Sequence, residues 1–107
     1  MAKLTPLSDD DTLKISAAVL AAVGQATPAV PFSGRFNLHL SGVFIGTAVV
    51  ERSVDGGASY VVLTSLGSPI AFSAPASEVL QAPETNMLYR IRCTAWTSGA
   101  IQARLSQ

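Results

Sequence analysis

The stretch Ser53-Val54-Asp55-Gly56-Gly57-Ala58-Ser59-Tyr60 lies between two apolar runs, residues 43–50 and 60–63. Its two glycines can adopt the positive φ angles that tight hairpin turns require, and the aspartate carboxylate can accept hydrogen bonds from the backbone just ahead of it. The structural residues of this predicted turn are Ser53, Asp55, Gly56, Gly57 and Tyr60. A tight β-hairpin here places an antiparallel strand pair in mid-chain, so we interpret the alternating segments around it as strands.

Apolar residues alternate with polar ones in three further segments, residues 35–40, 88–95 and 100–105. This period of two is typical of strands that bury one face. The predicted inward residues are Phe36, Leu38 and Leu40, then Tyr89, Ile91, Cys93 and Ala95, then Ile101, Ala103 and Leu105. The opposite positions, which include His39, Arg90 and Arg92, are expected to face outward.

The remaining segments are less regular. Residues 12–23 have no polar face and favour a strand over a helix, with Leu13, Ile15, Ala17, Val19, Ala21 and Val23 as the alternating apolar set. Pro28 and Pro31 indicate an edge strand or an irregular extended segment, because proline cannot donate to a strand ladder. Residues 70–73 predict a short strand, whereas residues 75–86 form a long connection that can hold one helical turn at 77–80.

Seven or eight short strands with turn residues every eight to twelve positions predict an all-β protein. We expect a single antiparallel β-sandwich domain over residues 12–107, a jelly roll or an immunoglobulin-like Greek key, preceded by an N-terminal arm of residues 1–11. The segment from Leu80 through Pro83 to Tyr89 resembles the tyrosine corner of immunoglobulin and fibronectin type III sandwiches. That resemblance implies a phenol bonded to upstream backbone.

The 107 residues carry seven basic and seven acidic side chains, and only 13% of them are charged against 49% hydrophobic. A surface so poor in charge indicates a face covered by other copies or by a partner. Zero net charge argues against general binding to nucleic-acid phosphates. Residues 17–23 are too few for a membrane span or a signal peptide, so we expect a protein made in the cytoplasm.

We find no constellation of catalytic or metal-binding residues in the sequence, and we expect neither a cofactor nor a metal. His39 is the single histidine and is placed on an outward strand position. Cys93 is expected to be a buried, inert thiol. Glu51 and Asp55 flank the hairpin and could approach each other as the two carboxylates of a glycosidase do. We expect no such catalytic pair, because Glu51 neighbours Arg52 and Asp55 has a turn-forming role.

Three groups of residues are candidates for contacts with partners. Arg90, Arg92 and Arg104 form an exposed basic stripe if the last two strands pair as a hairpin, and either Glu51 or Glu84 or a neighbouring subunit can neutralise it. Trp96 is suited either to an interface or sugar contact or to capping the core. The contact residues expected in the arm are Leu4, Pro6, Leu7, Asp9, Asp10 and Asp11.

The hairpin stretch, residues 53–60, is similar to the Asp box of sialidases and other β-propellers, with Tyr60 at the usual tryptophan position. In those proteins the motif is a hairpin remote from the active site. One copy in 107 residues implies hairpin architecture and no sialidase activity.

Residues 34–107 are also similar to small virion proteins of tailed phages and prophages. The shared pieces, in order, are Gly34-Arg35-Phe36-Asn37-Leu38, Leu40-Ser41-Gly42, Gly46-Thr47, Glu51-Arg52-Ser53, Asp55-Gly56-Gly57, Phe72, Ala74-Pro75, Glu84, Tyr89-Arg90, Thr97-Ser98-Gly99 and Arg104-Leu105-Ser106-Gln107. The resemblance implies a non-enzymatic structural part of the particle, located in the virion and made in the bacterial host.

From the resemblance and the composition together we expect a capsid decoration or cement protein. Such a protein binds and stabilises the assembled shell as an oligomer, with the major capsid protein or other virion proteins as partners. The alternative is a carbohydrate-binding module of a tail or fibre, in which Trp96 and Tyr60 stack on sugars.

Overall fold

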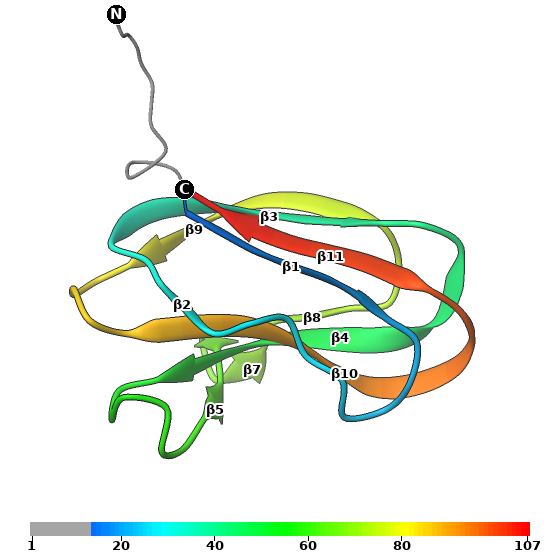
Figure 1. Ribbon diagram of the computed structural model, residues 1–107, viewed down its shortest axis with the longest axis horizontal. Helices are drawn as coiled ribbons and strands as arrows, with labels where there is room; N and C mark the ends of the chain where they lie inside the picture. Colours follow the sequence, from blue (N-terminus) through cyan, green and yellow to red (C-terminus); the bar gives the residue numbers. More distant parts are fainter. Residues whose placement is uncertain (1–13) are drawn as a thin grey trace, which may run out of the picture.

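The computed structural model describes residues 14–107, and this range is built of β-strands with no helix (Figure 1). The strands are β1 (Ile15–Leu20), β2 (Val30–Pro31), β3 (Gly34–Ser41), β4 (Phe44–Ser53), β5 (Val61–Val62), β6 (Thr64–Ser65), β7 (Ser68–Pro69), β8 (Ala71–Phe72), β9 (Ala76–Ala82), β10 (Leu88–Gly99) and β11 (Ile101–Ser106). The described range accordingly contains no apolar helix of membrane-spanning length. The all-β prediction is confirmed, while the arm, residues 1–11, lies outside the described residues.

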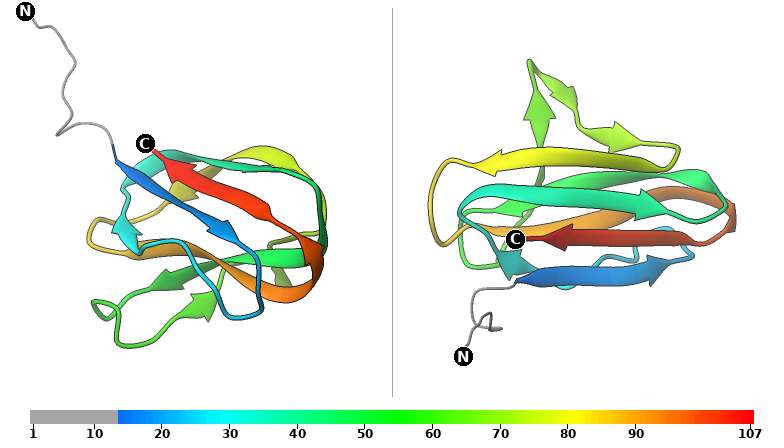
Figure 2. Two further views of the ribbon diagram at one scale, coloured as in Figure 1. Left: turned by 45° about the vertical axis from the view of Figure 1, so that its right-hand side comes forward. Right: turned by 90° about the horizontal axis from the view of Figure 1, so that it is seen from above.

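The strands form two main sheets that face each other (Figures 1 and 2). The first sheet has the order β1-β11-β3-β9. The second has the order β2-β10-β4-β5, with β8 also pairing with β4. A small hairpin, β6 with β7, projects from this body. The predicted β-sandwich is therefore confirmed.

The pairing of the strands is nested. β1 pairs with β11, β2 with β10, β3 with β9, and β4 with both β5 and β8, each pair antiparallel. The chain also passes from one sheet to the other between β1 and β2, β2 and β3, β3 and β4, β8 and β9, β9 and β10, and β10 and β11. This double Greek-key winding is that of a jelly roll, the first of the two predicted topologies.

The core lies between the sheets and centres on three aromatic rings. Phe32 and Phe36 stack with their centroids 4.8 Å apart, and the Tyr89 ring lies 4.8 Å from Phe36 at a tilt of 50°. Aliphatic side chains from both sheets complete the core, namely Leu20, Leu38, Leu40, Val50, Ile91, Ile101 and Leu105. Burial of each such side chain contributes about 1.5–3 kcal/mol to the hydrophobic driving force.

The predicted inward faces of β3 and β11 are confirmed, as are Tyr89, Ile91 and Cys93 of β10. Ala95 was expected inward, but a register irregularity between Cys93 and Ala95 leaves it exposed.

The predicted apolar face of β1 is wrong. Ser16 and Leu20 point into the sandwich, whereas Ile15, Ala17 and Val19 are exposed. A one-residue shift of this kind moves every side chain of a strand to the other face.

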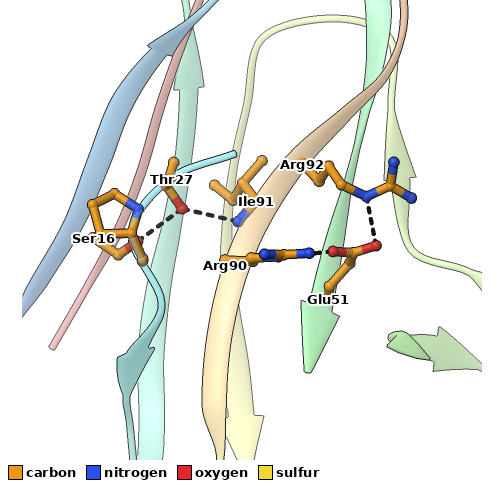
Figure 3. Close-up of polar contacts among 7 residues, drawn as sticks. Ser16, Thr27, Glu51, Arg90, Ile91 and Arg92 are labelled. Carbon is orange, nitrogen blue, oxygen red and sulfur yellow. Dashed lines mark hydrogen bonds and ion pairs between the residues drawn. The ribbon is translucent and has the colours of Figure 1, made fainter. Parts of the chain in front are cut away.

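A buried polar contact explains how Ser16 is accommodated in the core. A hydrogen bond of 2.8 Å joins the hydroxyls of Ser16 and Thr27, and Thr27 Oγ1 accepts the Ile91 amide at 3.0 Å (Figure 3). The Ser16 hydroxyl also bonds the Pro28 carbonyl. These bonds tie β1 of the first sheet to the segment before β2 and to β10 of the second. Such buried hydroxyls are tolerated because each has partners.

Two predictions about local structure need correction. The helical turn expected at 77–80 is part of strand β9, which pairs with β3 along its length. The Asp-Gly-Gly segment is not a tight turn, because β4 and β5 end their pairing at Arg52 and Val61 and leave an eight-residue loop. The hairpin itself is confirmed.

The tyrosine corner is also not formed. The Tyr89 hydroxyl contacts Met87 Sδ at 3.7 Å rather than upstream backbone, and the whole side chain is buried in the core. The tyrosine therefore serves as a core aromatic and not as a latch on the crossing loop.

Candidate functional site

The predicted basic stripe is divided between the two sheets. β10 and β11 do not pair as a hairpin: β10 pairs with β4 and β2, whereas β11 pairs with β1 and β3. Arg90 and Arg92 therefore lie on the outer surface of the second sheet, and Arg104 lies on the outer surface of the first. The prediction that the three form one exposed contact surface is wrong.

Arg90 and Arg92 are bound to a single carboxylate, Glu51 (Figure 3). Nε of Arg90 lies 2.9 Å from one carboxylate oxygen and Nε of Arg92 lies 2.6 Å from the other. The Glu51 side chain is 5% exposed, because the two guanidinium groups cover it. Each arginine thus has a partner within the chain, as the predicted neutralisation by Glu51 requires.

The same cluster fastens the hairpin loop to the sheet. The Arg90 guanidinium lies over the Tyr60 ring, 3.6 Å from its centroid, in a cation–π contact. Tyr60 is the last residue of the 53–60 loop, so this contact closes the loop against β10. The cluster therefore acts as a structural cross-link made by Glu51, Arg90, Arg92 and Tyr60. One face of the Tyr60 ring is covered by Arg90, so that face cannot stack on a ligand.

The loop is organised internally by Ser53 and Asp55. Ser53 Oγ accepts the Gly57 amide at 2.8 Å and donates to Asp55 at 2.7 Å. The Asp55 carboxylate accepts the amide and the hydroxyl of Ser59 at 3.0 and 2.6 Å. These hydrogen bonds, those from Ser59 first, lower the pKa of Asp55 to about 2. Ser53 and Asp55 thus order the loop from within, and the Asp55 carboxylate is engaged by its own loop.

Trp96 lies on β10 at the opposite end of the strand from Arg90. Its indole N–H donates to the Gly99 carbonyl at 3.0 Å, and its side chain is 37% exposed. Six residues of strand separate Trp96 from Arg90, a distance of about 20 Å. Trp96 and Tyr60, which is held by Arg90, therefore do not form one stacking platform.

The outer face of the first sheet, within the described residues, combines an apolar strand, β1, with polar and basic side chains on β11 and β3 and carries no acidic residue. Its outward positions are Ile15, Ala17 and Val19 on β1, Gln102, Arg104 and Ser106 on β11, Arg35, Asn37, His39 and Ser41 on β3, and Ser77, Val79 and Gln81 on β9. Arg104 and His39 are directly opposed across β11 and β3. We refer to this surface as the outer face.

A shallow depression of about 390 Å³ lies on the outer face over β1, β11 and β3. The depression forms where the lining side chains are small. His39 and Arg104 contribute polar groups to its lining, and Val19 forms an apolar rim. Its full lining is Ala17, Ala18, Val19, His39, Ser41, Gln102, Ala103 and Arg104. An arginine and a histidine beside an apolar rim are suited to bind a partner surface that carries carboxylates next to apolar side chains.

The depression on the outer face was not predicted from the sequence, although the alternating pattern placed His39 on an outward position and Arg104 was among the predicted contact residues. The missing information was that β11 lies between β1 and β3, which brings Arg104 opposite His39 and beside Ala17. The arm residues selected for contacts, Leu4, Pro6, Leu7 and residues 9–11, lie outside the described range.

The groups considered for chemistry are dispersed. His39 is exposed on the first sheet, whereas Cys93 is fully buried and burial raises the pKa of its thiol. Within residues 14–107, no group of three or more histidine, cysteine, aspartate or glutamate side chains is placed to hold a metal ion.

The comparisons with known proteins identify no relative of the chain. No protein-family model matches the sequence. Searches of curated proteins and of solved structures likewise found no match to the chain.

Proposed function

We propose that the chain is a non-enzymatic structural protein of a tailed-phage or prophage particle, a capsid decoration protein that binds the assembled shell as an oligomer. The observation that carries the proposal is the outer face, with its opposed Arg104 and His39 and its apolar rim. The proposal follows the resemblance of residues 34–107 to small virion proteins, and the jelly roll is an architecture common in viral capsids.

The charge distribution supports a protein partner of acidic and apolar character. Residues 14–107 contain six basic and four acidic side chains. Arg90 and Arg92 are occupied by Glu51, so Arg35 and Arg104 are the arginines that the outer face offers to a partner. Two arginines and one histidine are too few for strong binding to a phosphate backbone, which depends on many such contacts.

The mechanism that we propose is thermodynamic. A protein that binds the assembled shell and not its free subunits stabilises the shell by mass action, by about 2.7 kcal/mol per site at a hundredfold excess over Kd. Copies that bridge adjacent shell subunits gain further from multivalency. No chemical step is required, so the chain needs only a rigid scaffold and a complementary face.

The test is co-sedimentation of the purified chain with immature and with expanded shells of the phage or prophage that encodes it. We expect binding to expanded shells, weakened by salt because exposed charges contribute. Arg104→Glu, at the centre of the outer face, should lower the affinity about tenfold or more. Glu84→Gln, in the exposed connection between β9 and β10, is the control and should bind as the unmodified chain does.

The result that would overturn the proposal is an absence of binding to either form of shell. Equal binding by the Arg104→Glu chain would instead show that the outer face is not the contact surface. Sugar-dependent quenching of Trp96 fluorescence would favour the tail or fibre carbohydrate-binding module, for which the described residues offer no platform that joins Trp96 and Tyr60.

A further inference from the structure

Within residues 14–107, the first sheet ends in β1, which pairs on one side only. In the view from above, β1 is the outermost strand of its sheet and lies beside β11 (Figure 2, right). The exposed edge of a strand carries N–H and C=O groups that can pair with another chain. Whether β1 offers such groups depends on which of its residues already bond β11.

The hydrogen-bond pattern at the start of β1 shows which of its residues bond β11. Lys14 and Gln107 exchange both backbone bonds, at 3.0 and 2.9 Å. In an antiparallel ladder, bonded pairs alternate with non-bonded pairs, so every second residue from Lys14 onward bonds β11. The backbone groups that point away from β11 belong to Ile15, Ala17 and Val19. The edge therefore offers three donors and three acceptors, and it ends at Ala21, whose amide is bonded by the Gln25 side chain at 2.7 Å.

The other sheet edges of the described chain carry features that discourage pairing. In β9, at the opposite edge of the first sheet, Glu78 occupies an inward-facing position opposite Leu38 yet remains exposed. In the second sheet, β2 contains Pro31, and β5 and β8 at the other edge have two residues each. Inward-pointing charges, prolines and very short strands are the usual protection of sheet edges. β1 has none of these: its six residues contain no charge and no proline.

The side chains along this edge are also apolar. Ile15, Ala17 and Val19 are all exposed on the outer face, and Val19 is 58% exposed. An exposed strand edge with such side chains is suited to add a strand from another molecule. A second copy of the same edge fits because it brings the same three donors and three acceptors and no repelling charge.

We propose that two copies of the chain pair through β1, antiparallel about a two-fold axis at Ala17. In this register Ala17 faces the partner's Ala17, and Ile15 faces the partner's Val19. All six free backbone groups of each strand edge are then used, in six hydrogen bonds across the axis. The two four-stranded sheets become one continuous eight-stranded sheet, and Ile15 and Val19 form two apolar cross-strand contacts on its outer face.

This inference concerns the free protein and does not depend on shell binding. The measurement is the mass of the purified chain in solution by sedimentation velocity, from low to high micromolar concentration. We expect a concentration-dependent dimer. A monomer at all concentrations overturns the proposal, whatever the co-sedimentation with shells shows.

Two surface valines provide matched variants. Val19 and Val79 lie on opposite edge strands of the same sheet, both on the outer face, with exposed fractions of 58% and 61%. Val19→Lys places a charge opposite the partner's Ile15 and should raise the dissociation constant of the dimer about tenfold or more. Val79→Lys should leave it unchanged. Both side chains are exposed, so circular dichroism and thermal melting should show the native fold. Equal dimerisation of the two variants would overturn the β1 interface.

Cross-linking tests the register. Residues that face each other in a hydrogen-bonded antiparallel pair have Cα atoms about 5.5 Å apart, within the range of a disulfide. Ala17→Cys should therefore give a disulfide-linked dimer under mild oxidation. Ser77→Cys on β9, also exposed at a strand edge, should not, and native Cys93 is buried and should not react. Equal cross-linking at both positions, or none at Ala17→Cys, would contradict the proposed axis.

Discussion

Glu51 on β4 accepts a hydrogen bond from Nε of Arg92 on β10 at 2.6 Å, although it lies on the outer surface of the sandwich. The carboxylate is protected from water by the two arginines that it binds, and Arg90 in turn covers Tyr60 of the hairpin loop. One acidic side chain thus holds together two strands and the loop that joins β4 to β5. This relationship makes the cluster part of the fold rather than a contact surface.

Glu51→Gln is expected to lower the free energy of unfolding by about 1–3 kcal/mol, because it leaves two guanidinium groups without their anion. The loss stays below that of a fully buried pair, since the arginine side chains are 27% and 31% exposed and water can solvate them. Urea unfolding measures the change. Glu84→Gln removes an exposed carboxylate and should change stability by no more than about 0.5 kcal/mol. A Glu51→Gln protein as stable as this control would show that the cross-link contributes nothing.

Asp55 predicts a pH dependence of the loop. Hydrogen bonds from Ser59 and Ser53 lower its pKa from 3.8 to about 2 in the folded state. Between these values the unfolded chain binds the proton more readily, so the contribution of Asp55 to stability is complete above pH 3.8 and is lost as the pH falls to about 2. NMR titration of the carboxyl should show the lowered pKa. Asp55→Asn should remove this part of the pH dependence of stability, and an ordinary pKa for Asp55 would contradict the observed hydrogen bonds.

Gly99 and Gly67 form a matched pair for testing the β10–β11 connection. Both have positive φ, +82° and +83°. A Cβ added at Gly99 would lie 2.1 Å from the Val43 carbonyl oxygen, whereas one added at Gly67 meets nothing within 4 Å. Gly67→Ala should therefore cost about 1 kcal/mol from backbone strain alone, and Gly99→Ala about 3 kcal/mol or more. Thermal unfolding compares them, and equal costs would mean that the backbones do not approach closely at Gly99.

Cys93 offers a probe of global unfolding. Its side chain is fully buried on the inner face of β10, and burial raises the pKa of its thiol. A thiol reagent should therefore not label the native protein at mildly alkaline pH, and labelling should become complete in denaturant. Labelling of the folded protein at the rate of a free thiol would contradict the inward orientation of this face.

The fold class and much of the core were predictable because β3 and β11 contrast large apolar residues with polar ones at alternate positions. Phe36 and Leu38 against Asn37 and His39 leave no doubt about the buried side. β1 offers no such contrast, because Val19 and Leu20 are similar in polarity and lie on opposite faces. The decisive feature was the burial of Ser16, which is permitted by Thr27 from eleven residues away. Local periodicity does not contain that information.

Strand partners were the second property that the sequence could not predict. Glu51 was among the groups expected to neutralise Arg90 and Arg92, and the structure confirms that pairing. Arg104 was grouped with them on the assumption that consecutive strands pair, whereas the chain crosses to the other sheet at Gly99. The resulting opposition of Arg104 and His39 depends on long-range topology. β9 was missed because Val79 is the one residue in it with a strong strand preference.

Electron cryo-microscopy of expanded shells incubated with the chain would decide whether it is a decoration protein. We expect additional density on the shell that fits the jelly roll, with Arg104 and His39 turned toward the major capsid protein. Shells that carry no additional density, or density in which Arg104 and His39 face solvent, would contradict it.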